Sequence, residues 1–195
     1  MPRRTLKYIE YYPTPKELYD KLVSAKGDYK IFSEVYLKRD RAFCSILYLL
    51  ALRVSEALRL LRKQIIFPEE PTNKIIVRGI FLSKSKRKGK PRKEQFRQEA
   101  WLPLQGPRVG FTDLILEYAK NLELEQKLFD FDRRRGWQIV NNLLSVPPHW
   151  LRAFGEDYLY SNWDHDLLAV ADYVKVDART LQLYIRRGYQ KYGAT

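Results

Sequence analysis

Cysteine and histidine are scarce in this sequence of 195 residues, which contains a single cysteine, Cys44, and two histidines, His149 and His165. One thiol cannot form an intrachain disulfide, and so few ligands argue against a cysteine- or histidine-rich zinc site. Cys44 lies within an apolar run, where a small buried side chain is expected rather than a reactive thiol. The sequence therefore predicts a protein without structural disulfides and without a metal site.

Long hydrophobic runs are also lacking. The longest apolar stretch, residues 42–52, is bounded by Arg41 and Arg53 and is too short to span a bilayer. No apolar leader follows Met1. We expect an intracellular protein with no membrane partner, in the cytoplasm with the nucleoid or, for a viral protein, in the cytoplasm of the host.

Acidic residues are too few to balance the basic ones: 36 Lys and Arg face 23 Asp and Glu, for a formal net charge of +13. An excess this large indicates an anionic partner, most often nucleic acid, because basic side chains release counterions from phosphates on binding. The content of 45% hydrophobic and 30% charged residues fits a folded, soluble domain. The length predicts one domain, residues 14–195, preceded by a polar and aromatic arm, residues 1–13.

Apolar periodicity predicts that most of the chain is helical. A capping box begins the first helix at Thr14, with Pro15 in the first turn and Glu17 three residues after the cap. Apolar residues three and four apart predict one long helix over residues 39–63, or two helices with a break near Leu52. Further helices are expected over residues 111–128, 136–144, 149–160, 164–173 and 178–189.

Two expected strands enclose a strongly basic segment. Alternating residues predict strands at 75–82 and 99–104, and the segment KSKRKGKPRK between them is too charged to pack. It is either a solvated charge run or a hairpin tip that contacts DNA phosphates. The second interpretation assigns DNA binding to Lys84, Lys86, Arg87, Lys88, Lys90, Arg92 and Lys93. The fold class is therefore α+β, mostly helical, with a small antiparallel sheet and a basic β-hairpin.

Charged residues interrupt two apolar regions at helical spacing. Arg53 and Glu56 lie three residues apart on one helix face. They form either a surface ion pair of little energetic value or a cation held at the rim of the core. His149 and Arg152 are also three residues apart, so both side chains can reach one ligand from the same helix face.

Three short motifs resemble those of the tyrosine recombinases, the family of phage integrases and Xer-type enzymes. ALRVSEAL, residues 51–58, resembles the first arginine box of the family. HWLR, residues 149–152, resembles the His-x-x-Arg box, and TLQLY, residues 180–184, resembles the segment that carries the nucleophilic tyrosine. The motifs follow the order and spacing of the family, with the basic hairpin between the first and the second. The resemblance covers residues 14–190 and indicates a Xer-like catalytic domain of the archaeal or archaeal-virus type.

The resemblance implies an enzyme that performs site-specific recombination on double-stranded DNA and acts as a tetramer. Arg53, His149 and Arg152 would hold the nonbridging oxygens of the scissile phosphate. Arginine suits this task because its planar guanidinium stays charged and matches phosphate geometry. Preorganised donors of this kind often make the largest contribution to catalysis. Glu56 would orient one of these donors.

By the same resemblance, Tyr184 is the nucleophile. Its attack would form a 3′-phosphotyrosine and release a 5′-hydroxyl, so that no ATP, metal or other cofactor is required. Tyrosine is a weak nucleophile because its pKa is about 10, and a cationic pocket favours the phenolate. The leaving 5′-oxygen would take its proton from a hairpin lysine, Lys84 first and Lys86 second.

The sequence departs from the family pattern in three respects. Lys175 stands nine residues before the nucleophile, where the family usually has histidine or tryptophan. As a catalytic residue it would donate to a phosphate oxygen as a flexible point charge, and full activity depends on that replacement. Ala51 replaces the usual glycine. The N-terminal DNA-clamping domain of the family does not precede residue 14, so we expect a stand-alone catalytic domain or a fragment of a longer protein.

A non-catalytic function is also open. Residues 164–188 fit a helix-turn-helix, with a turn at 174–176 and Asp177 as the cap of the second helix. The second helix would present four side chains to a major groove: Arg179, Gln182, Tyr184 and Arg186. The protein would then be a helix-turn-helix regulator or an inactive, recombinase-like architectural factor. An RNA-binding protein would share the charge, but the sequence lacks a recognisable aromatic platform.

Overall fold

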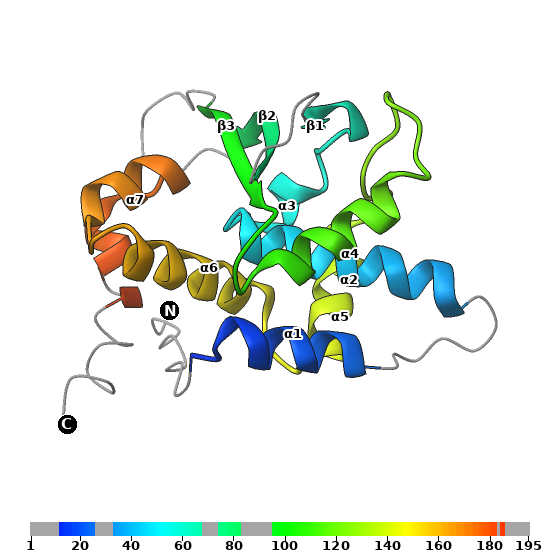
Figure 1. Ribbon diagram of the computed structural model, residues 1–195, viewed down its shortest axis with the longest axis horizontal. Helices are drawn as coiled ribbons and strands as arrows, with labels where there is room; N and C mark the ends of the chain where they lie inside the picture. The colour runs from blue at the N-terminus through cyan, green and yellow to red at the C-terminus, as the bar shows by residue number, and fades with distance from the viewer. Residues whose placement is uncertain (1–11, 26–32, 68–73, 83–94, 183, 186–195) are drawn as a thin grey trace, which may run out of the picture.

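A computed structural model shows helices packed around one central helix, with a small sheet on one side (Figure 1). It describes residues 12–25, 33–67, 74–82, 95–182 and 184–185. The elements in chain order are α1 (Pro15–Ser24), α2 (Ser33–Leu49), α3 (Val54–Ala57), η1 (Arg62–Gln64), β1 (Ile65–Ile66), β2 (Lys74–Leu82), β3 (Gln95–Pro103), α4 (Val109–Ala119), α5 (Arg133–Leu144), α6 (Pro148–Asn162) and α7 (Leu167–Val174). None of the helices in this part of the chain is long and apolar enough to cross a membrane.

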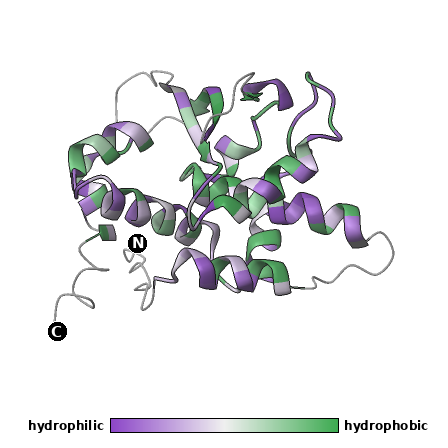
Figure 2. Cartoon of the chain, viewed as in Figure 1, coloured by the Kyte–Doolittle hydropathy of each residue, from purple (hydrophilic) through white to green (hydrophobic). Residues whose placement is uncertain are grey.

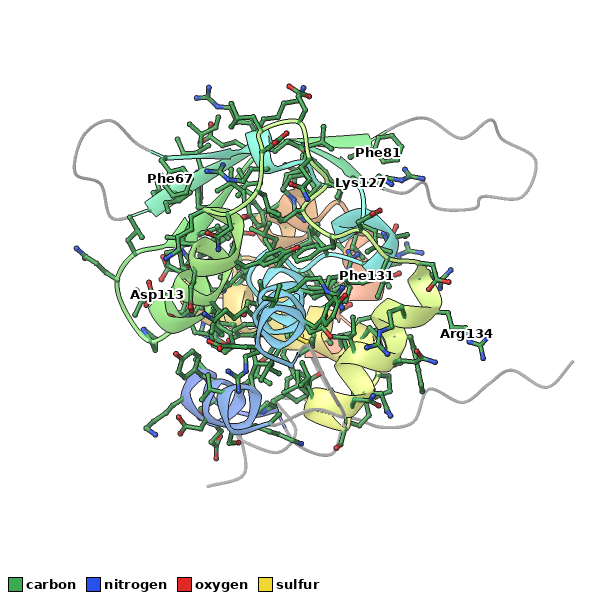
Figure 3. The ribbon with its side chains drawn as sticks, turned by 90° about the vertical axis from the view of Figure 1, so that its right-hand side faces the viewer. Phe67, Phe81, Asp113, Lys127, Phe131 and Arg134 are labelled. Atoms are coloured by element: carbon green, nitrogen blue, oxygen red, sulfur yellow. The ribbon has the colours of Figure 1, made fainter. Side chains whose placement is uncertain are left out.

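The central element is α2, whose second half is mostly apolar. Figure 2 shows this helix changing from hydrophilic at its start to hydrophobic at its end, and residues 42–49 are all buried, including Cys44, as predicted. It packs against α4, α5 and α6, which enclose it when the molecule is viewed along α2 (Figure 3). Phe43 meets Phe129 and Phe131 edge-on, with ring centroids 5.1 and 5.0 Å away. Each fully buried side chain of this size contributes about 1.5–3 kcal/mol, so α2 anchors the helices around it.

The predicted break near Leu52 is present. Helix α2 ends at Leu49, Ala51 adopts a left-handed backbone conformation with φ of 48°, and α3 begins at Val54. This conformation costs a residue other than glycine roughly 1 kcal/mol. The resulting change of direction places Arg53 at the N-terminal end of α3.

Helix α4 is shorter than predicted. A helix was expected over residues 111–128, but α4 ends at Ala119. Part of the chain that follows pairs with residues 60–63; for example, the Lys63 amide donates to the Leu124 carbonyl at 2.8 Å. These backbone bonds replace the helical ones, so the apolar spacing beyond Ala119 belongs to a loop packed on the core.

The sheet places β2 between β1 and β3, and all pairs are antiparallel. The β2–β3 pair is the predicted hairpin, and β3 starts earlier than expected, at Gln95. Burial alternates along β2, but the alternation shifts by one residue at Gly79, whose φ of 66° glycine tolerates without strain. Beyond this shift, Ile80 and its partner on β3, Arg97, are both buried.

The remaining helices begin and end within a few residues of the predicted positions. Helix α5 begins earlier than predicted because the carboxylate of Asp132 caps it, accepting from the Arg135 amide at 2.7 Å. Helix α6 begins at Pro148, and α7 ends at Val174. Residues 178–182 form the described start of the last predicted helix.

Candidate active site

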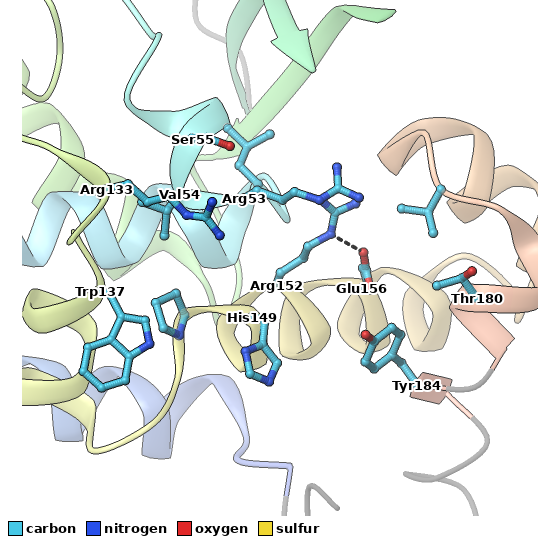
Figure 4. A pocket seen from close by; sticks show the side chains of 13 residues that line it. Arg53, Val54, Ser55, Arg133, Trp137, His149, Arg152, Glu156, Thr180 and Tyr184 are labelled. Atoms are coloured by element: carbon cyan, nitrogen blue, oxygen red, sulfur yellow. Dashed lines mark hydrogen bonds and ion pairs between the residues drawn. The ribbon is translucent and has the colours of Figure 1, made fainter. Parts of the chain in front are cut away.

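One open pocket collects side chains from four separate parts of the chain. Its volume is about 520 Å³, and it lies between the start of α3, the start of α5, α6 and the segment that follows α7 (Figure 4). The lining residues are Leu52, Arg53, Val54, Ser55, Arg133, Trp137, Pro148, His149, Arg152, Glu156, Val176, Thr180 and Tyr184. Four of them were singled out from the sequence motifs: Arg53, His149, Arg152 and Tyr184.

Arg53 stands at the N-terminal end of α3, where Glu56 closes the first turn. The backbone amide of Arg53 donates to one oxygen of the Glu56 carboxylate at 2.8 Å, and Nη1 donates to the other at 2.7 Å. The Glu56 side chain is 1% exposed and that of Arg53 is 46% exposed. In this ion pair Glu56 lies in the core and Arg53 faces the pocket, so Arg53 is a cation held at the rim of the core.

Arg152 lies on α6 and is almost wholly buried. Its Nε donates to Glu156 at 2.7 Å, and its Nη1 donates to Glu56 at 3.4 Å. Its Nη2 donates to the carbonyl of Val174, at the end of α7, also at 3.4 Å. A guanidinium carries five N–H groups, so these three contacts fix its orientation and leave two N–H groups for a ligand.

The four charges form an alternating chain in which Glu56 joins the two arginines and Glu156 ends the series. Burial favours protonation of Glu56, but Arg152 and Arg53 together outweigh it and hold the pKa of Glu56 below its usual value. Burial dominates at Glu156, where it raises the pKa although Arg152 acts in the opposite direction. Glu56 is therefore ionised at pH 7 between the two arginines.

His149 lies one turn before Arg152 on α6, and both side chains face the pocket (Figure 4). Partial burial lowers the pKa of His149, so the imidazole is neutral at pH 7 and offers one N–H donor. The helix starts at Pro148, whose fixed φ suits a first turn. The three-residue spacing thus presents an imidazole and a guanidinium to one ligand.

Tyr184 is half-buried and lines the same pocket. In the view of Figure 4, its ring lies beside α6 below Glu156, on the side toward which His149 points, whereas Arg152 extends toward Arg53. The hydroxyl of Tyr12 donates to the carbonyl of Tyr184 at 3.1 Å, and Tyr12 is itself buried against Phe154 of α6. Tyr12 therefore fastens the segment that carries Tyr184 to the helix that carries two of the donors.

Lys175 is not among the residues that line the pocket. It follows α7 in a left-handed conformation with φ of 52°, and its ammonium group donates to Asp172 at 2.6 Å. Its neighbour Val176 lines the pocket instead. A role for Lys175 at a phosphate therefore stays a prediction.

The helix pair that suggested a helix-turn-helix is present. After α7 comes a turn, and residues 178–182 are helical, with the Asp177 carboxylate accepting from the Arg179 amide at 3.0 Å. Arg179 is exposed and Gln182 is half-buried. Tyr184, which the helix-turn-helix interpretation turns toward DNA bases, lines the pocket.

The basic hairpin tip cannot be assigned in the same way. Leu82 and Gln95, which flank it, pair in the sheet. Eight predicted DNA-binding residues lie outside the described residues: Lys84, Lys86, Arg87, Lys88, Lys90, Arg92, Lys93 and Arg186. Their roles, including that of the lysine general acid, stay predictions.

Several pocket residues escaped the sequence analysis. Glu156 was detectable, because it lies four residues after Arg152 and shares its helix face. Arg133 and Trp137 enter from the start of α5, and no motif marks them. These two also line an adjoining open groove of about 600 Å³, together with Arg134 and Gln138. Trp137 is 50% exposed, so a large aromatic surface lies between the two depressions.

The pocket is suited to a tetrahedral oxyanion beside a phenol. Two guanidinium groups and a neutral imidazole supply N–H donors, and Arg–phosphate hydrogen bonds are among the stronger ones in proteins. Tyr184, which carries the phenol, lines the same pocket. Across the described ranges, no group of three or more His, Cys, Asp or Glu residues is arranged to hold a metal ion.

Comparison with family models and with curated proteins returns no match. Among solved structures, the chain is similar to the XerH site-specific recombinase bound to difH substrate in a pre-cleavage complex, with 17% identity and a TM-score of 0.60. It is also similar to XerH bound to palindromic difH substrate in a post-cleavage complex, with 19% identity and a TM-score of 0.57. Each match covers 90% of this chain and 50% of the XerH chain, so this chain spans half the length of that protein. The mostly helical architecture with its small antiparallel sheet is the fold of a tyrosine-recombinase catalytic domain.

Proposed function

We propose that this protein is a site-specific DNA recombinase that cuts and rejoins double-stranded DNA through a covalent tyrosine intermediate. The observation that carries the proposal is the meeting of Arg53, Arg152, His149 and Tyr184 in one pocket. The net charge of +13 supports a DNA ligand. The similarity in fold to XerH, a recombinase bound to its DNA substrate, supports the same reaction class.

In the proposed reaction, the scissile phosphate binds with its nonbridging oxygens against Arg53, Arg152 and His149. The hydroxyl oxygen of Tyr184 attacks phosphorus and loses its proton, while the bond from phosphorus to the 5′-oxygen breaks. The products are a 3′-phosphotyrosine and a 5′-hydroxyl. Attack by a 5′-hydroxyl on the phosphotyrosine reverses the step and rejoins a strand. The phosphodiester energy is conserved, so the reaction needs no ATP, metal or other cofactor.

The proposal also assigns supporting roles. Glu56 fixes the two arginines relative to each other, since it contacts both. We assign protonation of the leaving 5′-oxygen to Lys84 or Lys86 on the hairpin. Lys175 would contribute to phosphate binding once it leaves Asp172. Four protomers would act together on two duplexes.

The wider assignments belong to the same proposal. Residues 14–195 would form the catalytic unit, preceded by an arm of residues 1–13. We retain the archaeal or archaeal-virus type from the sequence motifs, and such an enzyme would meet its DNA in the cytoplasm.

The test is covalent capture of DNA. Wild-type protein is incubated with nicked duplexes that lose the fragment carrying the 5′-hydroxyl after cleavage, and adducts are resolved on a denaturing gel. Wild type should form an adduct, and Tyr184→Phe should form none, because it lacks the attacking oxygen. Tyr36→Phe is the matched control, since Tyr36 lies on α2, is 46% exposed and does not line the pocket.

Two results would count against the proposal in different ways. An adduct that persists in Tyr184→Phe removes Tyr184 from its role but keeps the reaction class. Duplex binding with no adduct from any substrate would favour the non-catalytic DNA binder. The exposed Arg179 on a capped helix and the pairing of Lys175 with Asp172 outside the pocket are the observations that favour this alternative.

A further inference from the structure

Arg97 is a buried arginine that belongs to none of the sequence motifs. It lies on β3 and is 3% exposed. Its Nη1 donates to the carbonyl of Leu50 at 2.6 Å, and its guanidinium carbon lies 4.5 Å from the centre of the Tyr173 ring. Within the described part of the chain, its Nε and Nη2 are buried without a hydrogen-bond partner.

Burying Arg97 in this way costs folding free energy. Burying a cation and leaving two of its nitrogen atoms unsatisfied both oppose folding. Burial lowers the pKa of Arg97, and the nearby Arg152 acts in the same direction, while Tyr173 and Glu56 act against it. An apolar side chain of similar volume would be expected to stabilise the fold at least as well. The stability of the fold therefore gives no reason for an arginine at this position.

The two residues that Arg97 contacts lie in segments next to Arg53 and Arg152, the two motif arginines that line the pocket. Leu50, its hydrogen-bond partner, opens the turn that ends at Arg53. Tyr173, its stacking partner, precedes Val174, whose carbonyl accepts from Arg152. In Figure 1, β3 lies between α7 and the connection from α2 to α3.

A planar guanidinium suits this place for a geometric reason. It can donate in its own plane while its face lies against an aromatic ring, which a lysine ammonium cannot do. Arg97 thus contacts two segments at once: the turn that begins at Leu50, by a hydrogen bond, and the end of α7, through the Tyr173 ring. Because β3 is also a strand of the hairpin, the same side chain connects the hairpin to the Leu50 turn and to the end of α7.

We propose that Arg97 is a positioning residue that holds the turn before Arg53 and the end of α7 in a fixed relative position, so that Arg53 and Arg152 bind the same phosphate. Its catalytic consequence rests on the recombinase function proposed above. Its structural consequence, the ordering of these two segments, does not depend on that function. Arg97 itself is too buried to touch DNA.

The test compares Arg97→Met with a matched control, Arg78→Met. Arg78 lies on the neighbouring strand β2, is 61% exposed and pairs with Glu99 at 3.7 Å. Four quantities are measured for wild type and both variants: the melting temperature, amide hydrogen exchange, the single-turnover rate of adduct formation and the affinity for the same DNA.

Arg97→Met should keep or raise the melting temperature. Amide exchange should become roughly tenfold faster in residues 50–56 and 173–176, with little change elsewhere, because only these segments lose an anchor. The cleavage rate should fall by about tenfold to a hundredfold, as expected when donors shift by a fraction of an ångström to an ångström. DNA affinity should stay within about threefold. Arg78→Met should leave exchange in these segments and the cleavage rate unchanged.

The other outcomes overturn the assignment. Unchanged exchange in residues 50–56, or a cleavage rate within threefold of wild type, shows that Arg97 does not position Arg53. A uniform rise in exchange with a lower melting temperature shows a purely structural role. If Arg97→Met does not fold, the same criteria apply to Arg97→Lys, which keeps the charge without the planar face. If wild type forms no adduct, the recombinase proposal fails, and the exchange data alone decide whether Arg97 orders the two segments.

Discussion

At the scale of single residues, the pocket owes its shape to two buried glutamates that contact one arginine. Arg152 donates to Glu56 and to Glu156 from different nitrogen atoms, so its plane is fixed from two sides. The glutamates differ in their second partners, because Glu56 also accepts twice from Arg53. Burial raises the pKa of both glutamates, but at Glu56 Arg152 and Arg53 together outweigh it, whereas at Glu156 burial prevails over Arg152.

The two glutamates should therefore respond oppositely to pH when each is changed to glutamine. Glu56 has a lowered pKa in the folded state, so its ionised form stabilises the protein above the usual glutamate pKa, and this contribution is lost as pH falls. Glu56→Gln should cost on the order of 3 kcal/mol at pH 7, the usual cost of breaking a buried ion pair, and less in acid. Glu156 has a raised pKa, so its ionisation weakens the fold as pH rises. The stability of Glu156→Gln relative to wild type should accordingly improve with rising pH.

Urea unfolding of both variants and of wild type between about pH 3.5 and 8 measures these differences. The informative quantity is the sign of the pH trend, because both changes are isosteric and both affect a partner of Arg152. If the two variants show the same trend, the second contact of Glu56 with Arg53 is not what separates them.

At the scale of elements, the contact between α6 and α2 sets the depth of the site. Gly155 on α6 lies so near α2 that an added Cβ would stand 2.2 Å from the carbonyl oxygen of Tyr48. The two helices can approach this closely only because glycine has no side chain. Since α6 carries His149 and Arg152, the close approach of α6 to α2 places both side chains near the turn that carries Arg53.

Gly155→Ala should therefore destabilise the protein strongly. The new methyl group meets backbone rather than a flexible side chain, so the helices must separate. The expected cost is about 3 kcal/mol, at the upper end for overpacking, which corresponds to a fall of roughly 10 °C in melting temperature for a domain of this size. Ser161→Ala, an exposed change on the same helix, is the control and should leave the melting temperature unchanged. A melting temperature for Gly155→Ala equal to that of the control would mean that the helices are not held at this distance.

The same elements show which features the sequence could predict. Helix periodicity and motif spacing sufficed for the helical class, the hairpin and the joint placement of His149 and Arg152, because those features depend on neighbours along the chain. The end of α4 and the inward turn of Arg97 were not predictable. They depend on pairing with residues 60–63 and on the left-handed conformation of Gly79, which are set by contacts between distant segments. Tyr12 escaped for the same reason, since its partner is Tyr184.

At the scale of the whole molecule, the net charge of +13 is the feature most directly linked to a ligand. Long-range attraction of this kind draws in any nucleic acid, and it is screened by salt. On the function proposed above, charges near the pocket would have a second effect, because they would contact phosphates of a bound duplex. Arg133 lines both the pocket and the adjoining groove, and Arg134 lines the groove and projects from the surface in Figure 3.

The double variant Arg133→Gln/Arg134→Gln should therefore bind duplex DNA with a weaker dependence on salt. Each lost phosphate contact lowers the slope of log affinity against log salt by about 0.9, so two contacts lower it by roughly 2. The fold should not suffer, because cations at a helix N-terminus are unfavourable and α5 begins at Arg133. Lys16→Gln/Lys120→Gln is the matched control, since it removes two exposed charges from α1 and the end of α4 that line neither depression. Affinities measured by fluorescence anisotropy between about 50 and 200 mM salt give the slopes. Equal slopes for the two double variants would place the path of the DNA away from α5.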